Sequence, residues 1–327
     1  STWRWPVSGL GFITQKRALM PLDAQTLIEL GLDQTIPAEV NGRRNGTNND
    51  PAWDQDYRPS PEAFPDASVA MGKVTALADY ATSEIYPGTT RKIWFYRPAV
   101  NLTGPVRLII FNDGPFYLSR EGPVRATRVL DSLHHNHEIA PTAAIFISPG
   151  MPDHDVSAPI ASYGPLEAQR SLEYDQVTPR YGEFLFHEMI PLLEANLGLK
   201  VDSNPDFRTV CGISSGGIAA FNAAWHHPSE CRRVLSHCGS FTDIWGGHNY
   251  PSLIRQQPRK PLRAYLQSGE NDANTPFGNW AFANHAMASA LEFAGYDFHF
   301  EFGRGGHSLN HGGALLADSL RWLWQHK

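Results

Sequence analysis

The chain has 327 residues, of which 42% are hydrophobic and 18% charged, and its formal net charge is −6 at pH 7. This composition provides a hydrophobic core without disulfides, and the acidic balance argues against a nucleic-acid partner, which requires clustered positive charge. No apolar run approaches a membrane span, so we expect a soluble protein, and residues 1–30 show no signal-peptide pattern, although processing before Ser1 would hide one.

The first 71 residues have the composition of irregular chain. Residues 40–68, VNGRRNGTNNDPAWDQDYRPSPEAFPDAS, are dense in Gly, Pro, Asn and Asp, and a short helix is predicted before them at residues 22–31. Such a segment does not bury enough apolar surface to fold alone. We therefore expect residues 1–71 to pack as an extension on a main domain that spans residues 72–327.

From residue 72 the chain becomes regular. The strand-like runs GKVTALADYAT (72–82) and TRKIWFYRP (90–98) flank the turn SEIYPGT (83–89), so we expect an antiparallel hairpin. Six short apolar runs follow, each with the character of a buried strand: VRLIIFND (106–113), AAIFISPG (143–150), FRTVCG (207–212), RVLSHCGS (233–240), LRAYLQSG (262–269) and DFHFEFG (297–303).

Segments with helical periodicity lie between most of these runs. Residues 181–198 and 279–295 carry apolar side chains three and four positions apart. Apolar strands that alternate with amphipathic helices predict an α/β fold with an eight-stranded, mostly parallel sheet and helices on both faces. The segment from Met151 to Gln176 has the length of a lid-like excursion.

Two adjacent serines follow the strand at residues 207–212, in the sequence VCGISSGG. The pattern Gly-x-Ser-x-Gly fits one frame, which makes Ser214 the candidate nucleophile, because Ser215 would need glycine where Ile213 stands. A strand, a sharp turn and a helix form the elbow that exposes a nucleophilic serine. The alternative interpretation is a helix cap rich in glycine and serine.

A serine hydroxyl needs a base to take its proton and an acid to orient that base. In this architecture the three groups follow in the order serine, acid, histidine, each beyond the carboxyl end of a strand. ENDANT offers Asp272, with Glu270 as the alternative acid, and RGGHS offers His307.

An oxyanion hole requires two N–H donors, and the first is expected from Ser215, the residue after the nucleophile. The second is expected from the loop FNDGPFYL, where Pro115 has no N–H, which leaves Gly114 or Phe116. Aromatic residues in the loops at the strand ends are candidates for a substrate pocket, or else pack the loops: Phe116, Tyr117, Tyr163, Trp245, Phe277 and Trp280.

The ordered series of segments from residue 72 to the end of the chain resembles one esterase family, which includes the enterochelin (ferric-siderophore) esterases, feruloyl and acetyl-xylan esterases, and esterase D. The likeness lies in TSEIYPGTTRKIWFYRP, IIFNDG, RSLEYDQVTPRYGEFLFHEMIPLLE, GISSGG, SGENDANT, GNWAFANHAMASALEFAGYDFHFEF and GGHSLNHGGALLADSLRWLW. The resemblance implies an α/β-hydrolase fold, with Ser214 as nucleophile, Asp272 as acid and His307 as base.

The resemblance also implies a structural role for Arg170 and Glu173, which lie in a shared segment before the long helix. The chain departs from the family in two places. Related mycolyltransferases donate an oxyanion N–H from about where Pro115 stands, and the first 70 residues do not resemble the binding domain of the siderophore esterases. A siderophore substrate therefore does not follow from the resemblance.

Together these features predict a serine esterase that hydrolyses a small-molecule carboxylic ester through an acyl-enzyme, without a metal or an organic cofactor. Acyl transfer from the same acyl-enzyme, hydrolysis of an amide or lactone, and an inactive hydrolase-fold binding protein are the alternatives. The substrate, the oligomeric state, the compartment and a pairing of Cys231 with Cys238 stay open at this level.

Overall fold

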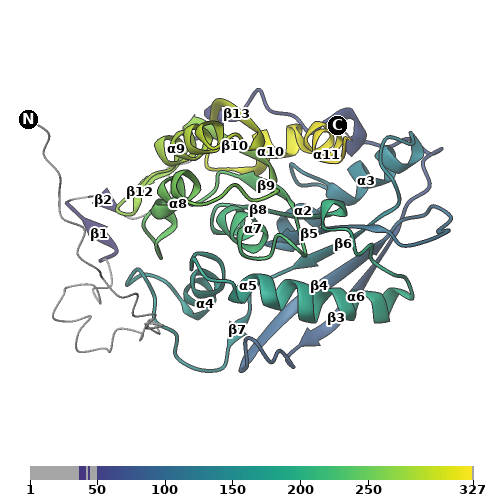
Figure 1. The fold of residues 1–327 in the computed structure, drawn as a ribbon, viewed down its shortest axis with the longest axis horizontal. Helices are drawn as coiled ribbons and strands as arrows, with labels where there is room; N and C mark the ends of the chain where they lie inside the picture. The colour runs from purple at the N-terminus through teal and green to yellow at the C-terminus, as the bar shows by residue number, and fades with distance from the viewer. Residues whose placement is uncertain (1–36, 42, 45–49, 326–327) are drawn as a thin grey trace, which may run out of the picture. The chain divides into compact units, whose positions relative to one another are not determined.

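A nine-stranded sheet forms the centre of the described chain, which comprises residues 37–41, 43–44 and 50–325 of this computed structural model (Figure 1). The strands follow the order β13-β10-β9-β8-β5-β6-β4-β3, and β7 pairs with β4 beside this path. The strands of this sheet are β3 (Lys73–Tyr80), β4 (Thr89–Arg97), β5 (Arg107–Asn112), β6 (Thr142–Ile147), β7 (Met151–Pro152), β8 (Arg208–Ile213), β9 (Arg233–His237), β10 (Arg263–Asn271) and β13 (Asp297–Gly306).

All of the predicted strands are present, and the predicted hairpin is confirmed. β3 pairs with β4 in antiparallel register, and β4 also runs antiparallel to β6, whereas the pairs from β6 through β5, β8, β9 and β10 to β13 are parallel. The ninth strand, β7, has two residues, too few for a periodic pattern to reveal. Two-residue strands also form two small pairs outside the sheet, β1 (Glu39–Val40) with β2 (Arg43–Arg44), and β11 (Asn274–Thr275) with β12 (Gly278–Asn279).

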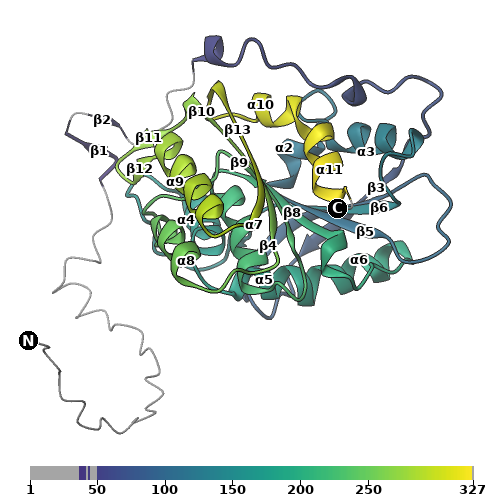
Figure 2. The ribbon, with the colours of Figure 1, turned by 45° about the horizontal axis from the view of Figure 1, so that its top comes forward.

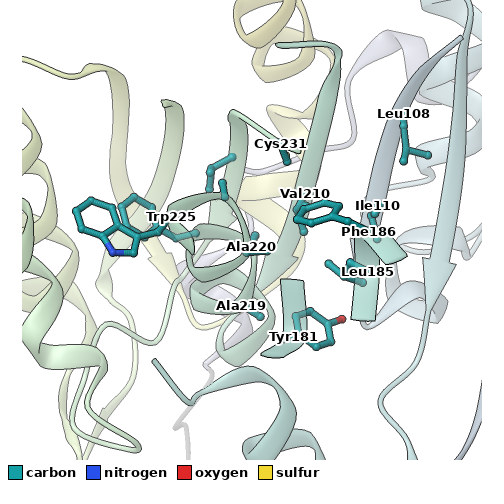
Figure 3. Close-up of a cluster of buried hydrophobic side chains, with 14 of the residues drawn as sticks. Leu108, Ile110, Tyr181, Leu185, Phe186, Val210, Ala219, Ala220, Trp225 and Cys231 are labelled. Carbon is teal, nitrogen blue, oxygen red and sulfur yellow. The ribbon is translucent and has the colours of Figure 1, made fainter. Parts of the chain in front are cut away.

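Both faces of the sheet are buried under helices, as predicted (Figure 2). In β5, Leu108 and Ile110 belong to one apolar cluster and Ile109 and Phe111 to the other, because successive side chains of a strand point to opposite faces. Figure 3 shows side chains of the first cluster, which lies against the long helix at residues 180–197 and against α7. This two-sided burial explains why the strands read as continuous apolar runs.

The helices divide between the two faces. The helices of one face are α2 (Gly114–Leu118), α3 (Ala126–His135), α10 (Leu309–Ala314) and α11 (Leu316–Trp324), and those of the other are α4 (Pro165–Tyr174), α5 (Arg180–Glu183), α6 (Ile190–Leu197), α7 (Ser215–His226), α8 (Tyr250–Gln256) and α9 (Trp280–Phe293). The described chain also contains four short 3-10 helices: η1 (Pro51–Trp53), η2 (Pro61–Ala63), η4 (Pro205–Phe207) and η5 (Gly247–Asn249).

The helix predicted at residues 181–198 is not a uniform α-helix. Residues Phe184–Met189 (η3) are π-helical and join α5 to α6. Pro191 lies at the second position of α6, directly after the wider turn. A proline has no N–H, and its ring clashes with the carbonyl oxygen four residues earlier, so a wider turn ahead of it relieves that clash.

Part of the excursion from Met151 to Gln176 is a helix rather than a loop, because α4 occupies residues 165–174. An ion pair fastens this helix to the sheet, since both guanidinium Nη atoms of Arg91 in β4 lie 2.9 Å from the carboxylate oxygens of Glu173. The two side chains are almost fully buried, and Glu173 also accepts from the backbone N–H of Gly150. Glu173 therefore has the structural environment that the family resemblance implied.

Residues 51–63 of the N-terminal extension pack on the main domain. η2 contacts α3, where the hydroxyl of Ser132 donates to the carbonyl oxygen of Glu62 at 2.8 Å, and η1 contacts β13. The helix predicted at residues 22–31 lies outside the described residues, so the packing of residues 1–71 as a whole stays a prediction. Of the helices in the described chain, none has both the length and the apolar character that crossing a membrane requires.

The three cysteines, Cys211, Cys231 and Cys238, are buried free thiols. Cys231 donates to the carbonyl oxygen of Arg208 in the neighbouring strand instead of pairing with Cys238. The sequence left open whether Cys231 and Cys238 form a disulfide, and in the structure they do not.

Replacing Glu173 with alanine is expected to lower the free energy of unfolding by about 3–5 kcal/mol, because it leaves the buried guanidinium of Arg91 without a counter-charge. The control is Lys200→Ala, since Lys200 forms an ion pair with Glu194 but is 76% exposed; its loss is expected to be no more than about 1 kcal/mol. Urea denaturation of both variants measures the difference. Equal losses would contradict the structural role given to the Arg91–Glu173 pair.

Candidate active site

Ser214 lies at the sharp turn between β8 and α7. Its backbone has φ 60° and ψ −124°, a conformation that side-chain-bearing residues avoid and that nucleophile elbows hold under strain. Hydrogen bonds fix it on both sides, because Ser214 N–H donates to His237 O at 2.9 Å and Ser214 O accepts from Ser240 N–H at 3.0 Å. A Cβ at Gly212 would lie 2.3 Å from Gly216 O, so strand and helix approach this closely only with glycine.

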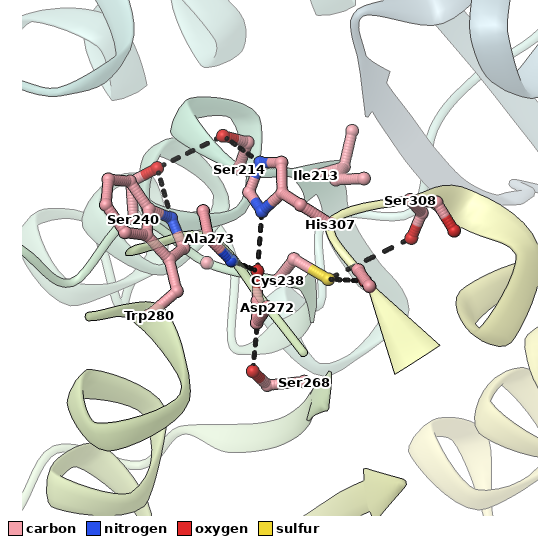
Figure 4. Close-up of polar contacts among 12 residues, drawn as sticks. Ile213, Ser214, Cys238, Ser240, Ser268, Asp272, Ala273, Trp280, His307 and Ser308 are labelled. Atoms are coloured by element: carbon pink, nitrogen blue, oxygen red, sulfur yellow. Dashed lines mark hydrogen bonds and ion pairs between the residues drawn. The ribbon is translucent and has the colours of Figure 1, made fainter. Parts of the chain in front are cut away.

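His307 follows β13 and brings its imidazole between two partners (Figure 4). Its Nε2 lies 2.9 Å from Ser214 Oγ, and its Nδ1 lies 2.6 Å from Asp272 Oδ1. A ring that donates from Nδ1 to the carboxylate presents Nε2 as an acceptor to the serine hydroxyl. The three residues that the sequence predicted as serine, acid and histidine therefore meet in one hydrogen-bonded row.

Asp272 lies just beyond β10, and its side chain is fully buried. Besides His307, its carboxylate accepts from the Ser268 hydroxyl at 2.5 Å and from the Ala273 N–H at 2.7 Å. These donors hold the carboxylate in one orientation toward His307. The alternative acid, Glu270, is exposed at the end of β10, where its side chain stays in solvent.

Two backbone N–H groups lie at the positions where an oxyanion hole is expected. Ser215 begins α7 and Gly114 begins α2, and among the described residues neither N–H has a hydrogen-bond partner. The N–H of Phe116 donates to Asp113 O at 3.0 Å, within the first turn of α2. Of the two donors left open by the sequence, Gly114 is therefore the one available to a ligand.

The loop after β5 is fastened to the elbow by polar side chains. Arg170 of α4 donates to both oxygens of Asp113, at 2.9 and 2.7 Å, and Asp113 has the left-handed backbone angle φ 53°. Asn112 donates from Nδ2 to Gly216 O at 2.9 Å. These bonds fix Gly114 relative to Ser215, which an oxyanion site requires.

A cavity of about 180 Å³ opens beside Ser214. Its lining combines aromatic, small polar and cationic side chains: Tyr163, Arg170, Ser214, Ser215, Ser240, Ile244, Ala273, Thr275, Phe277, Trp280 and His307. Three of the predicted pocket residues, Tyr163, Phe277 and Trp280, are among them. A wider cavity of about 740 Å³, near Arg97 and Glu194, contains none of these groups.

Three predicted pocket residues lie elsewhere, and the first of them, Phe116, is an exposed residue of α2 that does not line the cavity. Tyr117 is fully buried in the core, where its hydroxyl lies 3.0 Å from Nδ1 of His237, because the first turn of α2 directs its ring toward the sheet. Trp245 contacts α4 and donates from Nε1 to the Ser171 hydroxyl at 3.1 Å. The sequence placed Tyr117 and Trp245 at strand ends but did not give the direction of their side chains.

Sequence reasoning missed Ser240, whose Oγ lies 3.3 Å from Ser214 Oγ. Trp280 Nε1–H donates to Ser240 Oγ at 3.1 Å, so the Ser240 hydroxyl is free to donate its own proton toward Ser214 (Figure 4). Ser240 lies beyond the carboxyl end of β9, next to β8, and this position was the signal available in the sequence.

One group of described residues has ligand atoms close enough to hold a metal ion: Cys238, Asp272 and His307, whose atoms lie within 4.8 Å of one another. Burial, together with the carboxylate of Asp272, raises the pKa of the Cys238 thiol well above its usual value. A protonated thiol is a poor ligand, since metals bind the thiolate. This group is therefore better suited to hydrogen bonding than to coordination.

Comparisons with known proteins agree with this geometry. The family model named Esterase matches residues 83–323. An iron(III) enterobactin esterase of Dickeya dadantii (strain 3937) is 31% identical over 137 residues, which make up 37% of this chain and 30% of that enzyme.

Solved structures of esterases have a similar fold. The enterobactin esterase FES of Shigella flexneri has a TM-score of 0.58 at 21% identity and covers 83% of this chain and 62% of its own. The ferulic acid esterase AmCE1/Fae1A of Anaeromyces mucronatus has a TM-score of 0.63 at 12% identity and covers 84% of this chain and 97% of its own. The α/β-hydrolase fold is thus confirmed, and the chain spans only part of the length of the enterobactin esterases.

Replacing Ser240 with alanine is expected to slow the reaction of Ser214 with a fluorophosphonate probe by about 2- to 10-fold, the worth of one net hydrogen bond. The physical reason is that Ser240 holds Ser214 Oγ in line with His307. The matched control is Ser289→Ala, on the exposed side of α9, which should react like the wild type. Stopped-time labelling followed by mass spectrometry measures both rates, and an unchanged rate in Ser240→Ala contradicts the role given to it.

Proposed function

The chain belongs to the Esterase family, and from that membership we propose that it hydrolyses a carboxylic ester through an acyl-enzyme formed on Ser214. Family membership supports the activity of a carboxylic ester hydrolase, and both this activity and the assignment of roles to residues are our proposal. One observation carries it, namely the row of hydrogen bonds from Ser214 through His307 to Asp272 at the edge of a cavity.

In the acylation step, His307 Nε2 takes the proton of Ser214 while Oγ attacks the ester carbonyl carbon. Asp272 holds the ring tautomer and stabilises the imidazolium as it forms. The negative charge on the carbonyl oxygen is stabilised by the N–H groups of Ser215 and Gly114, and α7, which begins at Ser215, adds the positive end of its dipole. The tetrahedral intermediate then collapses, and His307 gives its proton to the departing alcohol.

Deacylation repeats these steps with water as the nucleophile. His307 takes a proton from the water as its oxygen attacks the acyl carbon, and returns it to Ser214 Oγ when the acid leaves. The only groups that gain and lose protons are Ser214, His307 and the two substrates, so the sequence of steps is balanced without any further reactant.

For the substrate, we propose an ester with an aromatic acyl group. Tyr163, Phe277 and Trp280 supply aromatic surface to the cavity beside Ser214, and Arg170 supplies a cation. The solved relatives are named for enterobactin and ferulic acid, and one enterobactin esterase structure was obtained with 2,3-dihydroxy-N-benzoyl-glycine. A flat ring packs well against aromatic walls, whereas a long flexible acyl chain exceeds a cavity of about 180 Å³.

A panel of aryl acetates, benzoyl and feruloyl esters, siderophore lactones and amides tests this substrate class. We expect kcat/KM to be highest for aromatic acyl esters. Product analysis with added alcohol separates hydrolysis from acyl transfer, because transfer yields a new ester in place of the acid. A preference for long aliphatic esters would contradict the proposed class.

Ser214→Ala is expected to abolish hydrolysis while leaving the free energy of unfolding nearly unchanged, because the elbow accepts a small side chain. Ser215→Ala is the matched control and should retain much of its activity, since the proposed contribution of Ser215 is its backbone N–H. Turnover of an aryl ester and thermal unfolding of both variants provide the measurements. An active Ser214→Ala together with an inactive Ser215→Ala would transfer the nucleophile to Ser215.

Asp272→Asn is expected to lower kcat by about 10²- to 10⁴-fold with little change in KM, because the amide no longer stabilises the imidazolium. Glu270→Gln is the control, and it should change kcat far less, since Glu270 is exposed. Steady-state kinetics between pH 5 and pH 9 compare the two variants over the working range. The reverse outcome would assign the acid to Glu270.

A further inference from the structure

Two side chains of the N-terminal extension, Asp54 and Tyr57, form hydrogen bonds with the residues around His307. Asp54 follows η1, and its two carboxylate oxygens accept from Gly306 N–H at 3.1 Å and from the Ser308 hydroxyl at 2.8 Å. The hydroxyl of Tyr57 accepts from Arg304 N–H at 3.0 Å. The extension therefore binds the residues immediately before and after His307, although more than half of the chain separates them in sequence.

The segment called here the His307 loop (residues 302–308) comprises the last five residues of β13 and the two residues that follow, and it has few side chains with which to hold its conformation. Its sequence, FGRGGHS, contains glycine at positions 303, 305 and 306. A Cβ at Gly303 would lie 2.1 Å from the Tyr57 hydroxyl oxygen, and one at Gly305 would lie 3.0 Å from Asp54 Oδ1. The glycines thus make room for the extension, and the contacts of Asp54 and Tyr57 add to the pairing with β10 in limiting the backbone freedom that the glycines introduce.

The environment of Asp54 is that of a structural anchor rather than of a solvent-facing acid. Its residue is 6% exposed, and each carboxylate oxygen has its own donor from the loop. The Tyr57 ring stacks on His311 of α10 with 4.0 Å between ring centroids, which places a second contact just beyond the loop. Asp54 and Tyr57 both lie outside residues 83–323, the part of the chain that matches the family model.

We propose that Asp54 is a positioning residue for His307, and that the N-terminal extension completes the active site by holding the His307 loop in its reactive conformation. This proposal rests on the proposed function, because it concerns the base of that reaction. Asp54 does not line the cavity beside Ser214, so its effect passes through the loop backbone.

Loss of these bonds leaves the pairing with β10 to hold the end of β13, and the imidazole then spends less time aligned between Ser214 and Asp272. A displacement of the order of 1 Å in such an alignment lowers rates by up to about 100-fold. Because neither Asp54 nor Tyr57 lines the cavity beside Ser214, the loss should appear in kcat and leave KM close to the wild-type value.

The test compares Asp54→Ala, Asp54→Asn and Tyr57→Phe with Glu62→Ala in the full-length chain. Asparagine keeps an acceptor for Gly306 N–H and offers an N–H to Ser308 Oγ, so it can rebuild both bonds without the charge. Glu62 belongs to the same extension, but it pairs with Arg321 of α11, away from His307. The readouts are kcat, KM, the fluorophosphonate labelling rate of Ser214, and deuterium uptake of the peptide that contains residues 303–310.

We expect Asp54→Ala to lose about 10- to 100-fold in kcat and in labelling rate, with KM unchanged and faster deuterium uptake in the loop. Asp54→Asn should lose much less, Tyr57→Phe should lose kcat to an intermediate extent, and Glu62→Ala should keep the wild-type kcat. If Asp54→Ala does not fold, Tyr57→Phe carries the test, because it removes one hydroxyl and keeps the stacked ring.

Wild-type kcat in Asp54→Ala, or in Tyr57→Phe if the alanine variant does not fold, would overturn the proposal. So would an equal loss in Glu62→Ala, because that result would trace the effect to general loosening of the extension. His307→Ala separates this proposal from the proposed function. If His307→Ala is inactive while Asp54→Ala has normal kcat, only the positioning role fails; if His307→Ala keeps its activity, the proposed function fails.

Discussion

The candidate site depends on the position of one side chain, the imidazole of His307, which lies between Ser214 Oγ at 2.9 Å and Asp272 Oδ1 at 2.6 Å. The three side chains come from the ends of three different strands, so their meeting depends on the order of the sheet. β8, β9, β10 and β13 are parallel neighbours, and their carboxyl ends therefore share one edge. A slip in any of these pairings would move a partner out of hydrogen-bond reach.

Loops that carry reactive groups must be held still, and here buried polar contacts hold them. Asn112 ties the end of β5 to the elbow, Arg170 clamps Asp113, Ser268 orients Asp272, and Asp54 binds on both sides of His307. Each of these side chains satisfies backbone or side-chain groups that would otherwise be unpaired. The site is thus supported by side chains that are not part of the hydrogen-bonded row of Ser214, His307 and Asp272. One of them, Asp54, lies outside the residues that match the family model.

The solved esterases have a similar fold at 12–21% identity, so the fold is kept although most of the sequence differs. Pro115 removes one N–H from the loop after β5, and the N–H of Phe116 is engaged with Asp113 O, so the proposed second oxyanion donor is Gly114. Variation of loops on a constant sheet is how one fold serves many substrates.

The sequence by itself determined eight of the nine strands of the sheet, the frame of the Gly-x-Ser-x-Gly motif and the order Ser214, Asp272, His307, because periodicity and turn chemistry are local. It did not give the π-helical turn before Pro191, the inward direction of Tyr117, or the contacts of Ser240 and Asp54. Those depend on which segments pack together: Asp54 and Gly306 are 252 positions apart, and no local pattern links them. Only the tertiary structure decided them, since packing sets side-chain direction.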